Sequence, residues 1–153
     1  AKVGMGVAVK EGAKAPDISS VDAFKNALTA AALVAYTDPK AGGTSGIYFD
    51  GLLEKLGIAD QVRSKAKLQA GGYVAELVAK GEAEIAVHQI SEIVPVKGVK
   101  LVGPLPAAVQ LTTIYAGGIA TAPKDMAAAQ ALMAFLASPQ AETVLKAQGM
   151  EKP

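Results

Sequence analysis

The residue types best suited to hold a ligand lie in a glycine-rich turn between an expected strand and an expected helix. The turn, Ala41-Gly42-Gly43-Thr44-Ser45-Gly46, follows Asp38-Pro39. Backbone N–H groups at a helix start point outward with partial positive charge, and glycines allow a ligand to approach them closely. Thr44 and Ser45 add two hydroxyl groups. The pattern predicts an anion-binding turn, and a capped helix after a flexible turn is the structural alternative.

Two further segments follow expected strands in the same way. Gly71-Gly72-Tyr73-Val74 opens an expected helix, and His88-Gln89 ends an expected buried strand. Helix starts that follow neighbouring strands can converge at the carboxyl edge of a sheet. His88 and Gln89 can both donate to an oxygen ligand, and the sequence leaves open which of them does so. An ordinary turn and a structural histidine are the alternatives at these two places.

Enzyme motifs do not fit the glycine-rich turn. A phosphate-binding Walker loop needs a lysine that the turn lacks. A nucleophile elbow needs Gly-x-Ser-x-Gly, but Ile47 stands where the second glycine belongs. Ser45 with His88 as its base would be a hydrolase arrangement, and nothing else in the sequence supports it. We therefore expect a binding protein with no catalytic residues.

Composition narrows the class further. The chain has 153 residues, 51% hydrophobic and 19% charged, which suits one folded domain with a substantial core. It has no cysteine, one histidine and a net charge of +1. These counts exclude a disulfide scaffold and most metal sites, and they offer no surface field for nucleic acid. We expect no metal and no cofactor.

The expected elements alternate between strand and helix. Ser19 or Ser20 caps the first expected helix, and Ser138 caps the last. Strands are expected at 3–9, 33–37, 65–68, 84–88, 99–102 and 109–120, and helices at about 20–31, 44–56, 72–81, 125–137 and 139–148. This alternation up to about residue 103 predicts an α/β sheet with helices on its faces.

The order of these segments resembles a known family. The stretch from Tyr36 through the glycine-rich turn to Gly57 is similar to periplasmic molybdate-type solute-binding proteins of ABC importers. Segments 81–85, 99–106 and 135–150 are similar to the family's second lobe and C-terminal helices. The resemblance implies a type 2 periplasmic-binding-protein-like α/β fold. Two lobes joined by crossing strands would then hold a small oxyanion through backbone N–H and hydroxyl groups.

The same resemblance implies the ligand contacts. They fall on Ser45 with Thr44 beside it, on Val74 with Tyr73 beside it, and on Gln89 with His88 beside it. Molybdate binders commonly have tyrosine where Gln89 stands. The expected ligand is therefore an oxyanion such as molybdate or tungstate, with phosphate-like, sulfate-like or small carboxylate ligands as alternatives.

The resemblance also implies a division of the chain. Residues 1–10 would be a crossing strand, residues 10–108 one complete lobe, and residues 109–153 a return crossing strand with C-terminal helices of a second, incomplete lobe. The start of that lobe would lie upstream of Ala1. The apolar face of the C-terminal helices would then be covered by self-association as a homo-oligomer, by strand exchange or by a separate chain.

The expected partners and location follow from the family. They are a small anionic ligand and the membrane subunits of an ABC importer, without nucleic acid. No signal-peptide pattern is found at the N-terminus of this chain, so the family implies a processed periplasmic protein. The alternative function with the same fold is the effector-binding domain of a LysR-like transcription regulator. A hydrolase is a further alternative.

Overall fold

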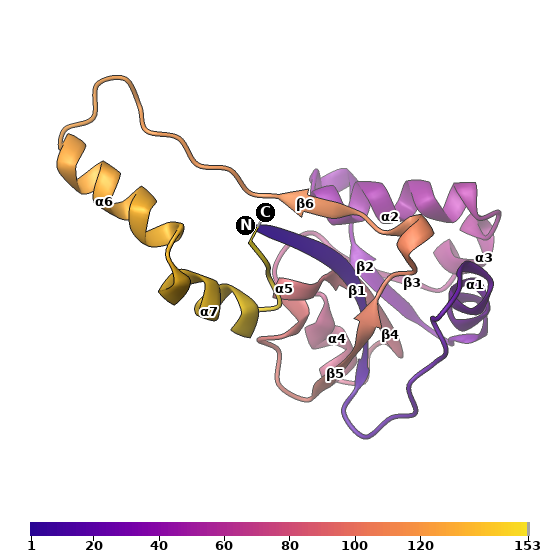
Figure 1. Ribbon diagram of the computed structural model, residues 1–153. Coiled ribbons are helices and arrows are strands. Elements are labelled where there is room, and N and C mark those ends of the chain that lie inside the picture. The colour runs from indigo at the N-terminus through magenta and orange to yellow at the C-terminus, as the bar shows by residue number, and fades with distance from the viewer. Residues whose placement is uncertain (153) are drawn as a thin grey trace.

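A computed structural model describes residues 1–152 as one mixed sheet with helices on both faces and a helical pair at the C-terminus (Figure 1). The strands are β1 (Lys2–Lys10), β2 (Val34–Thr37), β3 (Ala66–Gln69), β4 (Ile85–Gln89), β5 (Val99–Pro104) and β6 (Thr112–Ile114). The α-helices are α1 (Val21–Ala30), α2 (Thr44–Lys55), α3 (Ala59–Arg63), α4 (Ala75–Ala79), α5 (Ile90–Ile93), α6 (Met126–Leu136) and α7 (Pro139–Ala147). The predicted α/β fold is confirmed.

The strand order brings several strand ends to one edge of the sheet. The order is β3-β2-β4-β1-β5, and β6 pairs with the first residues of β1. Strand β2 runs parallel to β3 and β4, whereas β1 runs antiparallel to β4, β5 and β6. The carboxyl ends of β2, β3 and β4 therefore lie beside the beginning of β1. This edge is where the predicted ligand-binding turns begin.

The two faces of the sheet bury different side chains. Helices α1, α2 and α3 cover one face with large residues such as Phe24, Phe49 and Leu53, all fully buried. Helices α4 and α5 cover the other face with smaller residues such as Val78. Neighbouring residues of a strand point to opposite faces, so Val87 joins the first cluster and Ala86 the second.

Local signals placed most helix ends correctly. The Ser20 hydroxyl accepts a hydrogen bond from the backbone N–H of Ala23, and the Ser138 hydroxyl accepts one from Ala141. Both are N-caps as predicted. Gly57, which follows α2, has a φ of +68°, as expected for a glycine that ends a helix. Helices α3 and α5 were not predicted, because helices of five and four residues are too short to show periodicity.

The strand predicted over residues 109–120 is wrong for most of its length. Only Thr112–Ile114 is a strand, preceded by a 3-10 turn at Ala107–Val109. Strand β6 pairs with Lys2–Gly4, and the backbone of Tyr115 bonds that of Ala1. The apolar residues after Tyr115 form a long connection that leads to α6 instead of a strand.

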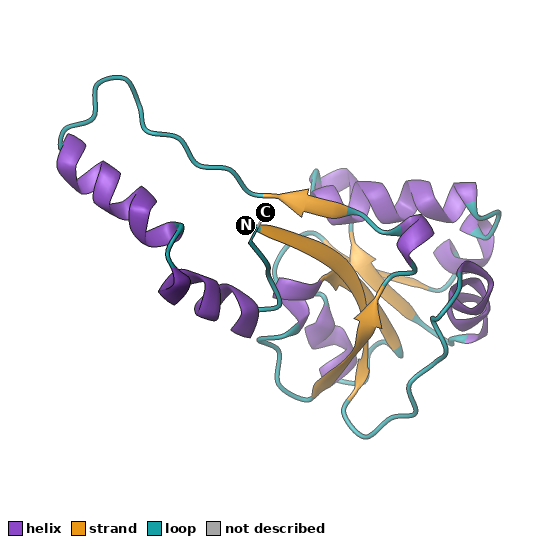
Figure 2. Cartoon of the chain, viewed as in Figure 1, coloured by secondary structure: helices purple, strands orange, loops and turns teal. Residues whose placement is uncertain are grey.

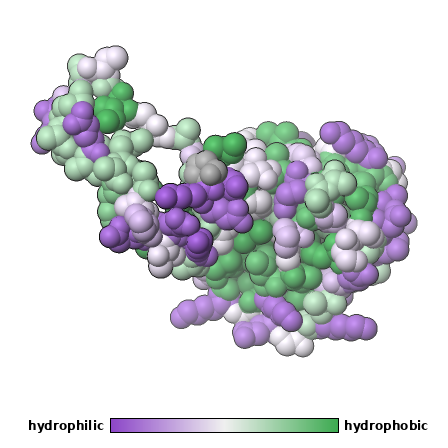
Figure 3. Space-filling model, in the orientation of Figure 1, coloured by the Kyte–Doolittle hydropathy of each residue, from purple (hydrophilic) through white to green (hydrophobic). Residues whose placement is uncertain are grey.

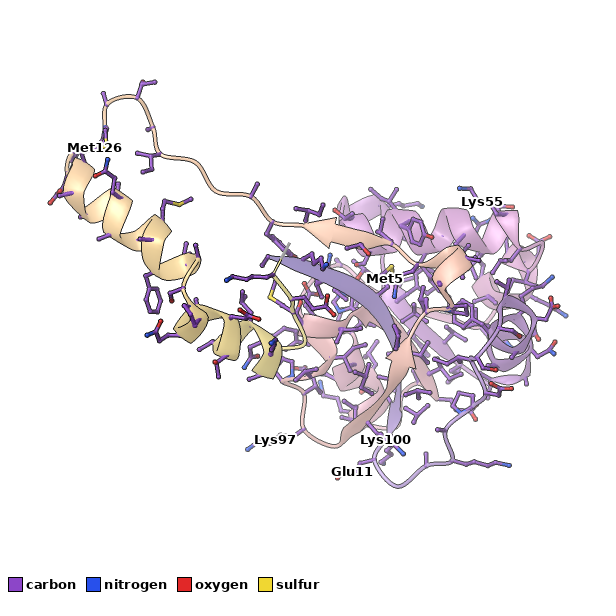
Figure 4. The ribbon with its side chains drawn as sticks, viewed as in Figure 1. Met5, Glu11, Lys55, Lys97, Lys100 and Met126 are labelled. Atoms are coloured by element: carbon purple, nitrogen blue, oxygen red, sulfur yellow. The ribbon has the colours of Figure 1, made fainter. Side chains whose placement is uncertain are left out.

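Helices α6 and α7 stand apart from the sheet. The connection after β6 leads away from the lobe, and α6 and α7 return toward its N-terminal edge (Figure 2). Met126 marks the outer end of α6, far from Met5 in the sheet (Figure 4). Apolar residues gather on this part of the surface (Figure 3). Leu132, Phe135, Leu136 and Val144 are each more than half exposed. The predicted uncovered apolar helix face is present in this chain.

An ion-pair cluster joins α2, α3 and β2. The Arg63 guanidinium donates from Nε to Asp50 Oδ1 at 2.9 Å and from Nη2 to Asp50 Oδ2 at 2.6 Å, and it also pairs with Glu54. Asp50 accepts a hydrogen bond from the buried Tyr36 hydroxyl. Burial, with Asp50 as the second cause, raises the pKa of Tyr36 to about 12. The hydrogen bonds from Arg63 hold the pKa of Asp50 below its usual value.

Arg63→Gln is expected to weaken the fold most clearly near neutral pH. A carboxyl whose pKa is lowered in the folded state stabilises that state above the ordinary Asp pKa of about 4, and this contribution is lost as the pH falls. Urea unfolding at about pH 7 and about pH 3 should show the variant losing less stability between the two than the unsubstituted chain. Equal losses would show that Asp50 is not held by Arg63 in solution.

Candidate functional site

The glycine-rich turn forms the start of α2 at the carboxyl end of β2. Gly43 is the N-cap residue and makes no side-chain cap. The first backbone hydrogen bond of the helix runs from the Ile47 N–H to the Gly43 carbonyl at 3.1 Å. The N–H groups of Thr44, Ser45 and Gly46 precede that bond and have no acceptor among residues 1–152. Three backbone donors therefore face the edge of the sheet.

Hydroxyl groups lie beside these donors. Ser45 is buried, and its Oγ lies 3.3 Å from Oγ1 of buried Thr37, so one of these hydroxyls donates to the other. Thr44 is exposed at the first position of α2. The turn thus offers hydroxyl and backbone N–H groups at the positive end of a twelve-residue helix. Such an arrangement can hold an anion without a charged side chain.

Gly46 explains how the helix start comes so close to the strand. A Cβ atom at position 46 would lie 2.3 Å from the Thr37 carbonyl oxygen. Real Cβ atoms do not approach a backbone oxygen that closely, so only glycine allows α2 to begin directly against the end of β2. This glycine sets the distance between the α2 donors and the strand ends, whereas the sequence indicated only that a glycine here would let a ligand approach the backbone.

Gln89 lies at the same edge and on the same face as α2. It pairs with Met5 across the sheet, and both share the face that α1 and α2 cover. Its side chain is buried. The amide Nε2 donates to Thr113 Oγ1 at 3.2 Å, and Oε1 accepts from the Tyr115 hydroxyl at 2.8 Å. The side chain of Gln89 is therefore held by Thr113 of β6 and by Tyr115, the first residue after that strand.

His88 points to the opposite face of the sheet. It pairs with Gly6, whose added Cβ would meet Ile90 and Leu101 on the α4 and α5 side. The His88 Nε2 lies 2.8 Å from the Glu92 carboxylate, and its buried Nδ1 has no hydrogen-bond partner. These contacts favour the structural alternative for His88. His88 is therefore not placed to act as a base for Ser45, whose hydroxyl is hydrogen-bonded to Thr37 among the described residues.

The helix predicted after the second glycine turn is shorter than expected and begins later. Helix α4 begins at Ala75, and Val74 at its N-cap is fully buried among the core side chains of that face. Val74 therefore presents no side-chain surface to a ligand. Tyr73 is 44% exposed. Gln69 at the end of β3 donates from Nε2 to the Gly71 carbonyl at 2.6 Å and so holds this turn against the sheet edge.

Two residues of this edge were missed from the sequence. Thr113 and Tyr115 reach Gln89 from 24 and 26 residues further along the chain. The Tyr48 hydroxyl of α2 bonds the Val109 carbonyl at 2.9 Å and ties the same segment to the helix that begins with Thr44. No local signal indicates these contacts, because antiparallel pairing of β6 with β1 creates them.

The described residues hold no cluster that would suit a metal ion. No group of three or more histidine, cysteine, aspartate or glutamate side chains meets that requirement within residues 1–152. Across the same range, no helix combines the length and apolar character that a membrane span requires. The N–H and hydroxyl groups at the start of α2 can bind a ligand that accepts hydrogen bonds.

Comparison with known proteins finds similarity over nearly the whole chain. The family model described as bacterial extracellular solute-binding protein matches residues 1–151. A curated relative, an aconitate isomerase of a Pseudomonas species, is 35% identical over 146 residues, which is 95% of this chain and 54% of that protein. This chain therefore spans about half the length of that relative.

Two solved structures share the fold. A substrate-binding domain assigned to a molybdenum ABC transporter of Clostridium difficile matches with a TM-score of 0.70 at 18% identity, over 99% of this chain and 64% of that one. The periplasmic molybdate-binding protein of Azotobacter vinelandii matches with a TM-score of 0.64 at 18% identity, over 99% of this chain and 66% of that one. At this identity the similarity establishes the architecture, which is that of periplasmic binding proteins.

Proposed function

This chain belongs to the bacterial extracellular solute-binding protein family, and from that premise we propose that it binds a small anion for an ABC importer. The anion is an oxyanion such as molybdate or tungstate, or a small carboxylate. Backbone N–H groups at the starts of α2 and α4, with the hydroxyls of Thr44 and Ser45 and the amide of Gln89, hold it. Tyr73 lies beside this site, and His88 supports it from the other face of the sheet.

One observation carries the proposal. Three N–H groups without acceptors, at the start of a twelve-residue helix, lie beside a buried pair of hydroxyls and on the same face as a buried glutamine. Partial positive charge at a helix start favours an anion, and neutral donors hold it reversibly. Reversible binding is what a receptor that passes its solute to a transporter requires.

The proposal includes a division into lobes. Residues 10–108 form one lobe, residues 1–10 and the segment from 109 cross between lobes, and α6 with α7 belongs to the other lobe. Two features support it: α6 and α7 stand away from the sheet, and their apolar face is exposed. Ligand binding would then close the lobes on each other. Light scattering measures the mass in solution, and a monomeric mass would show that no homo-oligomer covers this face.

Partners and location follow from the family. The membrane subunits of an importer would receive the ligand, and the protein would act in the periplasm. The LysR-like alternative has the same fold, but the family match favours the receptor.

A second candidate function is isomerisation of a tricarboxylate such as aconitate. The observation that favours it is the 35% identity to an aconitate isomerase over nearly the whole chain. An isomerase of this kind must also bind an anion, so the same donors would serve it. The ligand class would then be a carboxylate rather than a metal oxyanion.

Calorimetric titration with molybdate, tungstate, sulfate, phosphate and both aconitate isomers separates these functions. Saturable binding of one anion without turnover supports the receptor. Interconversion of the two aconitate isomers, followed by proton NMR, supports the isomerase. If the protein binds none of these anions, the proposed function is wrong.

A further inference from the structure

The side chain of Gln89 is held at both ends of its amide. Its Oε1 accepts from the Tyr115 hydroxyl, and its Nε2 donates to Thr113 Oγ1. An amide nitrogen carries two hydrogens, so these contacts use one and leave the other. Gln89 is buried at the edge where α2 begins, while Tyr115 is about half exposed.

The two distances distinguish the oxygen of the amide from the nitrogen. The contact to Tyr115 is 2.8 Å, the usual length of an O–H···O hydrogen bond. The contact to Thr113 is 3.2 Å, which suits the longer N–H···O bond. Hydroxyl groups can donate or accept, so the reverse orientation would place the nitrogen at the shorter distance. The lengths favour the orientation with Oε1 toward Tyr115.

We propose that Tyr115 is a positioning residue that, with Thr113, fixes Gln89 so that its remaining Nε2–H serves as a donor to the ligand. This inference rests on the proposed anion-binding function. With the amide fixed in this way, Gln89 offers the ligand a hydrogen-bond donor and no acceptor. The group bound there is a deprotonated oxygen of a carboxylate or an oxyanion, and a ligand hydroxyl that must donate is rejected.

The backbone around Tyr115 is itself anchored. Its N–H donates to the Ala1 carbonyl at 2.7 Å, and its carbonyl accepts from the Ala1 amino group at 3.1 Å. These bonds continue the pairing of β6 with β1. Immediately after Tyr115 the chain leaves the lobe toward α6 (Figure 1). The Tyr115 hydroxyl therefore links Gln89 to the segment that connects the sheet with helices α6 and α7.

The test uses Tyr115→Phe and Gln89→Glu, with Tyr48→Phe as the matched control. Tyr48 also donates its hydroxyl to the segment before β6, but to the Val109 carbonyl and not to Gln89. The probe is whichever of molybdate, sulfate, phosphate, cis-aconitate and trans-aconitate binds the unsubstituted protein. We expect Tyr115→Phe to weaken its binding about tenfold, Gln89→Glu to weaken it more, and Tyr48→Phe to leave it within about twofold.

A second measurement needs no ligand. In nitrogen-15 spectra the two Gln89 side-chain NH2 protons should differ in chemical shift from those of a free amide and exchange slowly with water, and Tyr115→Phe should move both signals toward the free-amide shifts and speed their exchange. Loss of these signals in the unsubstituted protein, or unchanged signals in Tyr115→Phe, overturns the positioning role whatever binds. Binding that survives Gln89→Glu shows that no N–H of Gln89 holds the ligand and overturns the donor assignment. If no anion binds but the amide signals behave as expected, the proposed function and the donor assignment are wrong. The positioning of Gln89 by Tyr115 is then still supported.

Discussion

Thr44→Asp is expected to abolish anion binding while leaving the free energy of unfolding unchanged or slightly higher. Thr44 is exposed at the first position of α2, where a carboxylate interacts favourably with the helix dipole by about 0.3–1 kcal/mol. The same carboxylate would lie beside the proposed anion. Two like charges about 4 Å apart repel by about 4 kcal/mol at the effective dielectric constant of a protein surface, so affinity should fall at least about 100-fold.

Thr44→Asn is the matched control for this change. Asparagine has nearly the size of aspartate and also suits a helix start, but it carries no charge. Titration should show Thr44→Asn binding within about threefold of the unsubstituted protein. Urea unfolding should show both variants folded. If Thr44→Asp binds the anion as tightly as Thr44→Asn, the ligand does not lie at the start of α2.

Gly46→Ala is expected to lower the free energy of unfolding by about 3 kcal/mol and to weaken ligand binding as well. The added Cβ would lie 2.3 Å from the Thr37 carbonyl oxygen and 2.9 Å from its carbonyl carbon. Both are backbone atoms of β2 and cannot rotate away. The helix must therefore move off the strand end, which opens the packing of Phe49 and displaces the N–H donors of Thr44 and Ser45.

Gly51→Ala in the same helix provides the control. Its added Cβ meets nothing within 4 Å, so the change should raise stability by about 0.5–1 kcal/mol through helix propensity. Thermal and urea unfolding followed by circular dichroism compare the two alanine variants directly. Equal stability of Gly46→Ala and Gly51→Ala would show that α2 does not begin against Thr37 in solution.

The sequence predicted the fold class and most elements because their signals are local. Alternating apolar residues gave β1, and serine caps located α1 and α7. The glycine-rich turn before α2 was recognisable because a helix start with free donors needs glycine and hydroxyl residues nearby. The apolar run after Val109 misled the prediction, since hydrophobicity alone does not distinguish a strand from an apolar connection.

The site itself was only partly predictable. Spacing along the chain selected Thr44, Ser45 and Gln89, which share one face and edge, but it could not separate Gln89 from His88. Pairing with β1 decided that difference, because alternation in a strand sends adjacent side chains to opposite faces.

The tertiary structure alone brought Tyr115 and Thr113 to Gln89, and only it showed the contact between Gly46 and Thr37. Local sequence determined the helix starts and strands, because capping and periodicity act over a few residues. Long-range pairing decided which side chains meet, because residues more than twenty positions apart share no local signal.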